Sequence, residues 1–542
     1  MAEMWLTWEG RPTASCRTCV LRTRCKGIRH DAGVPYESLS GARLCPMLYV
    51  VIAAALLVVG ITAAVVGKRH ARRFQRQRRI HVDRFKLKRR HAEIELEVFG
   101  SPEIVAAVQQ YARDHHVSIE AAARQARTYL REIVPKFNLL AYYRFGAPFA
   151  RAIMHFLYRP VVERRTLHEF NETAPKGASV VYIINHRSNA DYVLVAHMLF
   201  KFVSLSYAVG EWARVWPLNH IFKWFGGYFI RRRYREPLYH AVLSKFVQTI
   251  TRHGVTQGVF LEGGLTRDGA FQKPKLGMLD YLVGAKRGPG LEAPLFLIPT
   301  AINYDRVLED RNLTEELVGK EDRATKADKL RNTMDFLFRN LLRSIVKRFK
   351  RYGYAIVTFG TPISVDDFVR AHPEILDPGF ERRKAALTEL AELVMGEISR
   401  SIPVTPVTLV ARIFADHRTP LTNEEIVAGI DHYRELWHDR VWLLREKNGA
   451  EIWRAALPIM ELRHLIEPAE RWRSDLFDGE SVPVVEEAWA WSPRELMLRD
   501  YYANSLLTFA EVKQRGWPER KPRRGASAEG EVVRVSDGAP ST

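Results

Sequence analysis

The chain has 542 residues, of which 47% are hydrophobic and 11% are aromatic. This length is enough for roughly two to four domains, and the composition allows a sizeable core, which excludes a chain that is disordered throughout. The formal net charge is +20, but residues 68–90 alone contain twelve Lys or Arg and a single acid. This excess is local and has no interleaved aromatic stacking positions, so we expect no nucleic-acid partner.

Residues 1–45 are an N-terminal extension that holds every cysteine of the chain. These cysteines are Cys16, Cys19, Cys25 and Cys45. The spacing of the first three, followed by His30, is compatible with zinc, but the flanking sequence offers little core to hold such a site, so we expect no metal. Met47 is an alternative start of translation, in which case the extension is not part of the cellular protein. The rest of the sequence has no cysteine, which is consistent with a reducing compartment.

Residues 46–67, PMLYVVIAAALLVVGITAAVVG, contain no charged side chain. About 20 apolar residues in a helix cross a bilayer, because every backbone group is then satisfied within the segment. We therefore predict a transmembrane helix here, followed by a basic juxtamembrane segment at 68–91. The positive-inside rule places that basic segment on the cytoplasmic side, where it is attracted to anionic phospholipid. The expected location is the cell (inner) membrane, with a single pass and the rest of the chain in the cytoplasm.

The remaining chain falls into regions of different texture. Residues 92–170 have apolar residues at helical spacing, with helix starts at Ser101 and Ser118, and predict a helical region. Residues 171–368 alternate between strand and helix patterns and predict an α/β domain with a mixed central sheet flanked by helices. Residues 369–518 look largely helical. Residues 519–542 have few large apolar residues and predict a disordered tail.

The strands and helices expected in the α/β domain can be given as residue ranges. The predicted strands are 180–184, 227–231, 259–262, 295–303 and 355–359. The predicted helices are 190–201, 237–252 and 326–350. Beyond this domain, the clearest helical stretches are 381–400 and 423–506.

The stretch SVVYIINHRSNADYVLVAHML, residues 179–199, places polar residues at the end of a buried strand. Such a strand end commonly presents active groups at a cleft. Asp191 begins the next helix and is placed to hold one ring nitrogen of His186, which leaves the other nitrogen to take a proton from a hydroxyl. The alternative is that Ser188 or Asp191 is nothing more than a helix N-cap.

Several other chemistries lack their sequence signatures. There is no G-x-S-x-G elbow, no cysteine in the α/β region, no H-E-x-x-H cluster, no Walker A sequence and no G-x-G-x-x-G. The histidine is therefore expected to activate a substrate hydroxyl directly, with no covalent enzyme intermediate and no cofactor.

Cationic residues follow two later strands. The stretch GGYFIRRRY contains Arg231 and Arg232, whose forked guanidinium groups suit phosphate, although a solvated or lipid-facing cluster is the alternative. The stretch VFLEGGLTRDGAFQKPKLGML combines glycines that permit close backbone approach with the cations Arg267 and Lys275. A further buried strand, FLIPTAINYD, carries Pro299 and is more consistent with a pocket wall.

In this order, the four stretches resemble those of the membrane-bound glycerol-3-phosphate acyltransferase family. This family comprises H-x4-D acyltransferases and includes enzymes for lysophosphatidate and dihydroxyacetone phosphate. The matching residues are HRSNAD at 186–191, then Gly226, Phe229, Ile230, Arg231 and Arg232, then Phe260, Glu262, Gly263, Arg267 and Pro274–Lys275, then Ile298–Pro299 with Tyr304–Asp305. Weaker matches to the glycerol-3-phosphate branch are VTPVTLVA at 404–411 and YYANSLL at 501–507. The chain departs from the family at Leu265 and Thr266, where arginine and serine are frequent.

The resemblance implies transfer of a fatty acyl group from acyl-CoA or acyl-acyl carrier protein to glycerol 3-phosphate. The product would be lysophosphatidate, the first intermediate of phospholipid synthesis. His186 would be the general base and Asp191 its orienting partner. The substrate-binding residues implied are Arg187, Ser188, Phe229, Arg231, Arg232, Glu262, Gly263, Arg267, Lys275 and Pro299. The alternatives are an acyltransferase for dihydroxyacetone phosphate or lysophosphatidate, or an inactive membrane-tethered lipid-binding or scaffold protein.

Overall fold

The computed structural model describes most of the chain from residue 91 to residue 517. The described ranges are 91–134, 146–163, 165–199, 206–209, 227–231, 234, 236–287, 293–318, 351–417, 419–442, 444, 447–477 and 480–517. The predicted transmembrane segment 46–67, nearly all of the basic segment, the predicted helix 326–350 and the tail 519–542 lie outside these ranges. No helix within the described ranges is long and apolar enough to span a bilayer. All described residues belong to one compact unit, Ala64–Thr542.

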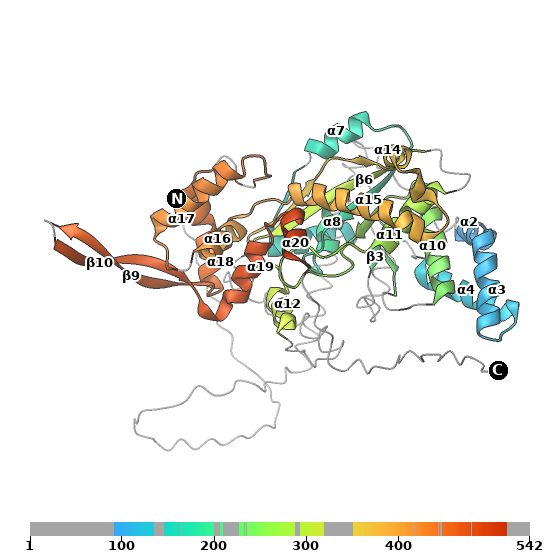
Figure 1. Ribbon diagram of the computed structural model, residues 1–542, viewed down its shortest axis with the longest axis horizontal. Coiled ribbons are helices and arrows are strands. Elements are labelled where there is room, and N and C mark those ends of the chain that lie inside the picture. Colours follow the sequence, from blue (N-terminus) through green and yellow to red (C-terminus); the bar gives the residue numbers. More distant parts are fainter. Residues whose placement is uncertain are drawn as a thin grey trace, which may run out of the picture. The chain divides into compact units, whose positions relative to one another are not determined.

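An eight-stranded sheet forms the centre of the described chain, with the order β1-β7-β6-β2-β5-β3-β4 and β8 beside β6 (Figure 1). Its strands are β1 Arg159–Val162, β2 Ser179–Ile184, β3 Ser206–Val209, β4 Gly227–Phe229, β5 Gln257–Phe260, β6 Leu295–Tyr304, β7 Tyr354–Phe359 and β8 Ile363–Ser364. β2 runs parallel to β5 and β6, whereas β7 runs antiparallel to β6. The predicted mixed sheet is therefore confirmed.

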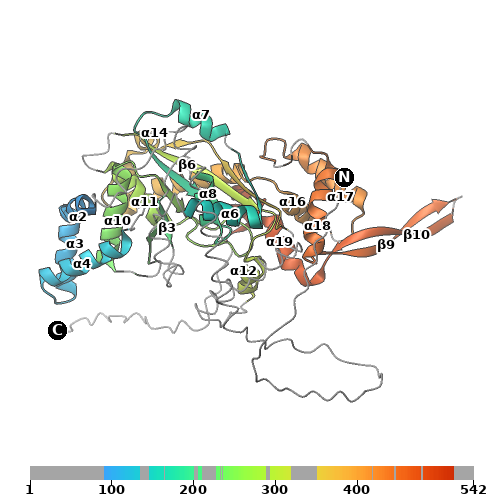
Figure 2. The ribbon, with the colours of Figure 1, turned by 180° about the vertical axis from the view of Figure 1, so that it is seen from behind.

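Several helices accompany this sheet, and some of them cover its two faces (Figures 1 and 2). They are α2 His91–Phe99, α3 Pro102–Asp114, α4 Ile119–Ile133, α6 Ala147–Leu157, α7 Arg165–Thr173, α8 Asp191–Leu199, α10 Pro237–Arg252, α11 Leu276–Val283, α12 Asp310–Leu317, α14 Val365–Ala371 and α15 Phe380–Arg400. α15 crosses one face (Figure 1), and α6 and α8 lie together on the opposite face (Figure 2). Because both faces are covered, the apolar run of β2 is buried from Val181 to Ile184.

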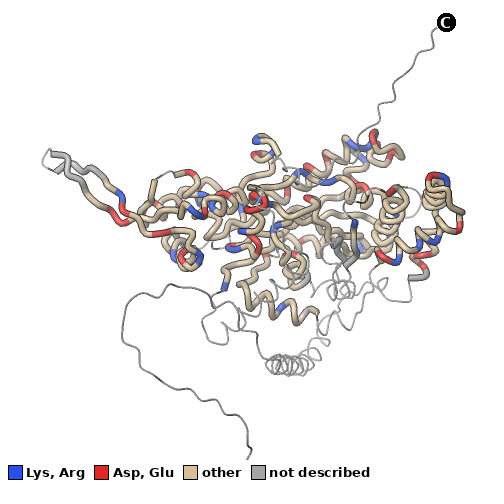
Figure 3. The backbone as a smooth tube through the Cα atoms, turned by 90° about the horizontal axis from the view of Figure 1, so that it is seen from below, with Lys and Arg blue, Asp and Glu red and all other residues tan. Residues whose placement is uncertain are grey.

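The C-terminal region adds a second group of elements. Its helices are α16 Pro406–Asp416, α17 Asn423–Leu436, α18 Gly449–Leu462, α19 Leu496–Asn504 and α20 Phe509–Arg515, and its hairpin is β9 Ile466–Phe477 with β10 Glu480–Trp491. In Figures 1 and 2 the hairpin extends away from the helices beside it. Acidic and basic residues are interspersed along the described chain (Figure 3).

Most strands and helices with a strong local pattern lie where the sequence predicts them. β2, β6, β7 and α10 agree closely with their predicted ranges, and the Ser118 hydroxyl caps α4 by accepting from Ala121 N at 3.2 Å. The sheet starts before residue 171, because β1 already belongs to it. The sequence did not predict β1, since the strand has only four residues and its Pro160 weakens the strand signal. The interpretation of 423–506 as largely helical misses the β9–β10 hairpin. β9 has few β-branched residues and contains Pro468, so its own sequence gives little indication of a strand.

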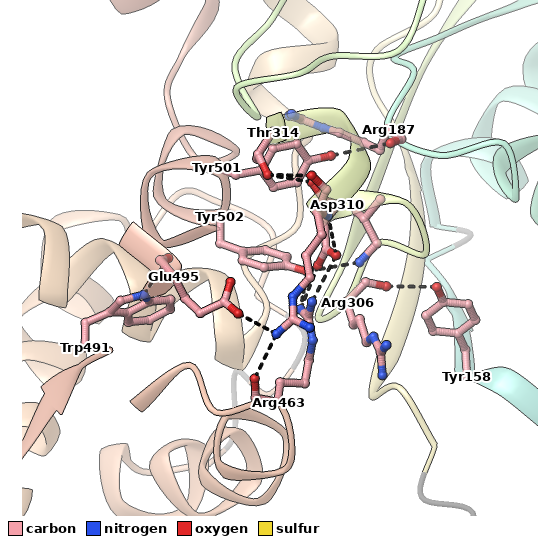
Figure 4. A network of polar contacts seen from close by, with 12 residues as sticks. Tyr158, Arg187, Arg306, Asp310, Thr314, Arg463, Trp491, Glu495, Tyr501 and Tyr502 are labelled. Carbon is pink, nitrogen blue, oxygen red and sulfur yellow. Dashed lines mark hydrogen bonds and ion pairs between the residues drawn. The ribbon is translucent and has the colours of Figure 1, made fainter. Parts of the chain in front are cut away.

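A buried ion pair joins the α/β part to the C-terminal region (Figure 4). Arg463, just after α18, contacts the carboxylate of Asp310 in α12 at 2.7 Å, and each side chain is only 4% exposed. The Tyr502 hydroxyl of α19 donates to the same carboxylate and accepts from Arg463 at 2.9 Å. Removing one partner of a buried pair costs about 3–5 kcal/mol, since a charge is left unpaired. This contact therefore holds α19 against the segment that follows β6.

Candidate active site

His186 lies two residues beyond the end of β2, at the edge of the sheet where the parallel strand β5 also ends. Ile184 of β2 is opposite Phe260 of β5 and Thr300 of β6. The chain after β5 therefore leaves the sheet beside the chain after β2. Glu262 meets His186 there and accepts from its backbone N at 2.9 Å.

The predicted contact between His186 and Asp191 is present. Nδ1 of His186 lies 3.0 Å from Oδ2 of Asp191, and the two residues are 2% and 0% exposed. The same oxygen accepts from the backbone N of Arg187 at 2.7 Å and of Ser188 at 3.0 Å. Asp191 is also the first residue of α8, so it closes the loop as well as contacting the histidine. With Nδ1 engaged, Nε2 is the ring nitrogen that can take a proton from a hydroxyl.

Aromatic packing holds the plane of the His186 ring. The ring stacks on Phe260 with centroids 4.2 Å apart and an interplanar angle of 29°. Tyr192 of α8 meets it edge-on at 5.5 Å. Phe260 and Tyr192 also contact each other, with centroids 4.9 Å apart. Stacking and the Asp191 contact together restrict the imidazole to one orientation.

Glu262 is a buried carboxylate that organises the turn after β5. Its two oxygens accept from His186 N at 2.9 Å and from Gln272 N at 2.8 Å. Burial raises the pKa of Glu262 to about 7, although Arg187 and the two backbone N–H groups act in the opposite direction. The adjacent Gly263 has φ +66°, and a Cβ there would lie 2.9 Å from Cγ of Lys275, so the turn requires glycine.

Arg187 braces the loop from inside the protein. Its side chain is 2% exposed, whereas the resemblance implied a substrate contact. One end nitrogen donates to Gly269 O, the other donates to Ser505 O at 3.2 Å, and the guanidinium lies 5.5 Å from the Phe271 ring centroid. The Tyr501 hydroxyl in turn donates to Arg187 O at 3.4 Å (Figure 4). The two end nitrogens of this arginine thus donate to the protein's own backbone.

Glu309, just before α12, is a site residue that the sequence did not indicate. It accepts from the Ser188 hydroxyl at 2.7 Å and from Asn189 N at 3.2 Å. Burial raises the pKa of its carboxyl group, Ser188 lowers it and the charge of Asp191 raises it further. Because Glu309 lies in no recognisable motif and is 121 positions from Ser188, only the folded chain reveals the contact.

The predicted phosphate ligands lie in different surroundings. Arg231 donates two bonds to Glu132 of α4, at 3.0 and 2.6 Å, and packs against three tyrosine rings. Arg267 is 30% exposed and donates to Glu316 at 2.7 Å. Lys275 is exposed at the start of α11. Arg232 lies outside the described residues, and Phe229 belongs to β4, although its side chain is not described.

Pro299 lies inside the sheet rather than at its edge. It is buried in β6 opposite Ile183, three residues before His186 in the neighbouring strand. The structure thus brings six predicted site residues together around one loop: His186, Arg187, Ser188, Asp191, Glu262 and Gly263. Within the described ranges, no group of three His, Cys, Asp or Glu side chains is arranged to hold a metal ion.

Two family models match this chain. The acyltransferase model covers residues 165–303, and the model for the glycerol-3-phosphate acyltransferase C-terminal region covers residues 338–510. The catalytic-loop candidates lie in the first match, whereas Arg463, Tyr501 and Ser505 lie in the second.

Curated proteins are also similar to this chain. The glycerol-3-phosphate acyltransferase of Aeromonas hydrophila is 28% identical over 357 residues, which is 63% of this chain and 42% of the relative. That of Alteromonas mediterranea is 27% identical over 376 residues, 67% of this chain and 44% of the relative. The chain therefore spans less than half the length of the curated relatives it matches. Among solved structures, the 1-acyl-sn-glycerophosphate acyltransferase PlsC of Thermotoga maritima aligns with 56% of this chain and 97% of its own, at 18% identity and a TM-score of 0.26.

The pKa of Glu262 predicts how Glu262→Gln changes the pH dependence of stability. The pKa of this carboxyl group is 4.5 in the unfolded chain and about 7 in the folded protein. Between these two pH values the folded protein retains a proton that the unfolded chain releases, so the free energy of unfolding falls as the pH rises. Glutamine has no such proton. The melting temperature of the variant should therefore rise relative to the native protein between about pH 5 and pH 8.

The measurement is thermal unfolding of both proteins across that range. Glu169→Gln, at an exposed position of α7, is the matched control and should show no trend. A constant difference between the native protein and Glu262→Gln would contradict the prediction.

Proposed function

We propose that this chain is a member of the glycerol-3-phosphate acyltransferase family and that it transfers a fatty acyl group from an acyl thioester to glycerol 3-phosphate. The matches to the two family models and to the curated relatives support this proposal. The product is lysophosphatidate, and the reaction is the first step of phospholipid synthesis. The observation that carries the proposal is the buried pair of His186 and Asp191 at the end of β2.

The proposed reaction is a single displacement assisted by His186. Its Nε2 takes the proton from the glycerol hydroxyl while Asp191 holds Nδ1 and supports the positive charge that develops on the ring. The hydroxyl oxygen attacks the thioester carbonyl carbon, so that a C–O bond forms and the C–S bond breaks. The proton then passes from His186 to the departing sulfur, which gives a free thiol. Acyl-CoA and acyl-acyl carrier protein both supply such a thioester.

The phosphate group is proposed to bind the cations that follow β4 and β5. Arg232, Arg267 and Lys275 are the candidates, since a phosphate held at a fixed place orients the hydroxyl toward the base. Arg231 is assigned a different part. Its bidentate contact with Glu132 fastens β4 to α4, and its guanidinium packs between Tyr129, Tyr234 and Tyr239.

We further propose that residues 46–67 anchor the enzyme once in the cell inner membrane. The support is the absence of charge across this segment and the basic block that follows it, which favours a cytoplasmic catalytic domain and contact with anionic phospholipid. A chain lacking residues 1–67 should lose most of its membrane association at high salt. Equal recovery of the full and shortened chains in salt-washed membranes would contradict the anchor.

The base is tested by His186→Ala in an assay of thiol release from an acyl thioester. The native protein should release thiol only when glycerol 3-phosphate is present, and the variant should be slower by a factor on the order of 10²–10⁴, because the hydroxyl keeps its proton. His168→Ala, at an exposed position of α7, is the control and should be fully active.

Two outcomes would overturn parts of this proposal. Full activity of His186→Ala would remove His186 as the base. Faster thiol release with dihydroxyacetone phosphate or lysophosphatidate than with glycerol 3-phosphate would show that glycerol 3-phosphate is not the preferred acyl acceptor.

The different parts of Arg231 and Arg232 are separated by substituting each with glutamine. Arg232→Gln should raise KM for glycerol 3-phosphate about tenfold, because a charge-assisted phosphate contact is lost, and should leave the melting temperature nearly unchanged. Arg231→Gln should instead lower the free energy of unfolding by about 1–3 kcal/mol, since it removes the ion pair with Glu132. Steady-state kinetics and thermal unfolding measure both. A larger rise in KM for Arg231→Gln than for Arg232→Gln would reverse the assignment.

A further inference from the structure

Tyr304 contacts the catalytic pair from a strand outside the loop. It is the last residue of β6 and is 0% exposed. β6 continues four residues beyond Thr300, which is opposite the end of β2, and this extension brings Tyr304 beside the loop. The Tyr304 hydroxyl donates to Oδ1 of Asp191 at 2.6 Å.

The two oxygens of Asp191 have separate partners. Oδ2 is shared by Nδ1 of His186 and by the backbone N of Arg187 and Ser188, whereas Oδ1 accepts from Tyr304. Donors on both oxygens fix the rotation of the carboxylate about its Cβ–Cγ bond. They also share its negative charge, because a hydrogen bond to the ionised form stabilises that form.

Tyr304 is a permanent donor in this arrangement. Burial and then the negative charge of Asp191 raise the pKa of its hydroxyl well above the ordinary value of 10. The hydroxyl therefore keeps its proton over the whole range in which a histidine base titrates. Its ring is held by a neighbouring tyrosine, Tyr158, with centroids 5.4 Å apart.

We propose that Tyr304 is a positioning residue. By sharing the negative charge of Asp191, it sets how strongly Asp191 stabilises the protonated form of His186. The proposal rests on the function given above, since it takes His186 as the base. Without the Tyr304 hydroxyl, more of the negative charge of Asp191 acts on Nδ1, and the protonated imidazole is stabilised. A base that is protonated more readily is inactivated by acid sooner, so that activity begins to fall at a higher pH when the solution is acidified. Such a base also returns its proton to the leaving sulfur less readily.

Tyr304→Phe neither adds nor removes a formal charge, and it replaces none of the other ionisable groups around this pair. They are Arg187 in the loop, Tyr192 in α8, Glu262 after β5 and Glu309 before α12. A change in pH dependence in a Tyr304 variant is therefore assigned to the lost hydroxyl rather than to a new charge.

Tyr304→Phe removes this one oxygen and keeps the ring in the core. We expect kcat to fall about tenfold and the acidic limb of the pH profile of kcat/KM to move up by about half a pH unit, with KM for glycerol 3-phosphate unchanged. Tyr158→Phe is the matched control, because Tyr158 is equally buried and its hydroxyl donates to Arg306 O at 2.8 Å instead. Tyr158→Phe should lower the free energy of unfolding about as much as Tyr304→Phe does, but it should leave the acidic limb of the pH profile where it is in the native protein.

A second readout needs no substrate. In the full-length chain labelled with [13C]histidine and held in detergent micelles, the signal absent from His186→Gln identifies His186. Its titration midpoint should be higher in Tyr304→Phe than in the native protein and in Tyr158→Phe. An unchanged midpoint, or an equal change in both tyrosine variants, would overturn the role of Tyr304. Absence of acceptor-dependent thiol release in the native protein would overturn the proposed function instead, and the titration would still decide the role of Tyr304.

Discussion

The structure of the site depends on the buried charge of Asp191. A carboxylate with 0% exposure is costly unless donors replace the water it has lost, and here four donors surround it. Two are backbone N–H groups of the loop itself, so satisfying the charge also determines the loop's shape. The third is the His186 ring, and the fourth is the Tyr304 hydroxyl. Loop closure and the orientation of the His186 ring are therefore consequences of one buried charge.

Two more acidic side chains lie around the same loop, which makes the site electrostatically costly. Burial raises the pKa of both Glu262 and Glu309, and the charge of Asp191 raises both further. Each of these carboxylates nevertheless accepts two hydrogen bonds, and at least one comes from the loop at 186–189. Arg187 is the positive charge among them, and it lowers the pKa of Glu262. Its burial is explained by this role, since an exposed arginine could not offset the charges inside.

The sequence predicts local contacts here and misses distant ones. His186 and Asp191 are five positions apart on either side of one turn, so their contact follows from the strand end and the helix start. β2 and β6 are predictable because most of their residues are apolar, and in β2 most are also β-branched. In contrast, Arg187 reaches Ser505 across 318 positions and Arg231 reaches Glu132 across 99. A motif can show that an arginine is present, but the partner of its guanidinium depends on how remote segments pack.

The same distant contacts make the C-terminal region part of the site. At Gly269, with φ +82°, a Cβ would lie only 1.8 Å from Tyr501 O, so the loop after β5 and the helix α19 touch through their backbones. Arg187 donates to a carbonyl on each side of this contact, Gly269 O and Ser505 O. The ion pair of Asp310 and Arg463 holds α19 from its other side through Tyr502. The two family-model matches, 165–303 and 338–510, therefore describe two parts of one structural unit, because the backbone of the second completes the hydrogen bonding of the loop that carries His186.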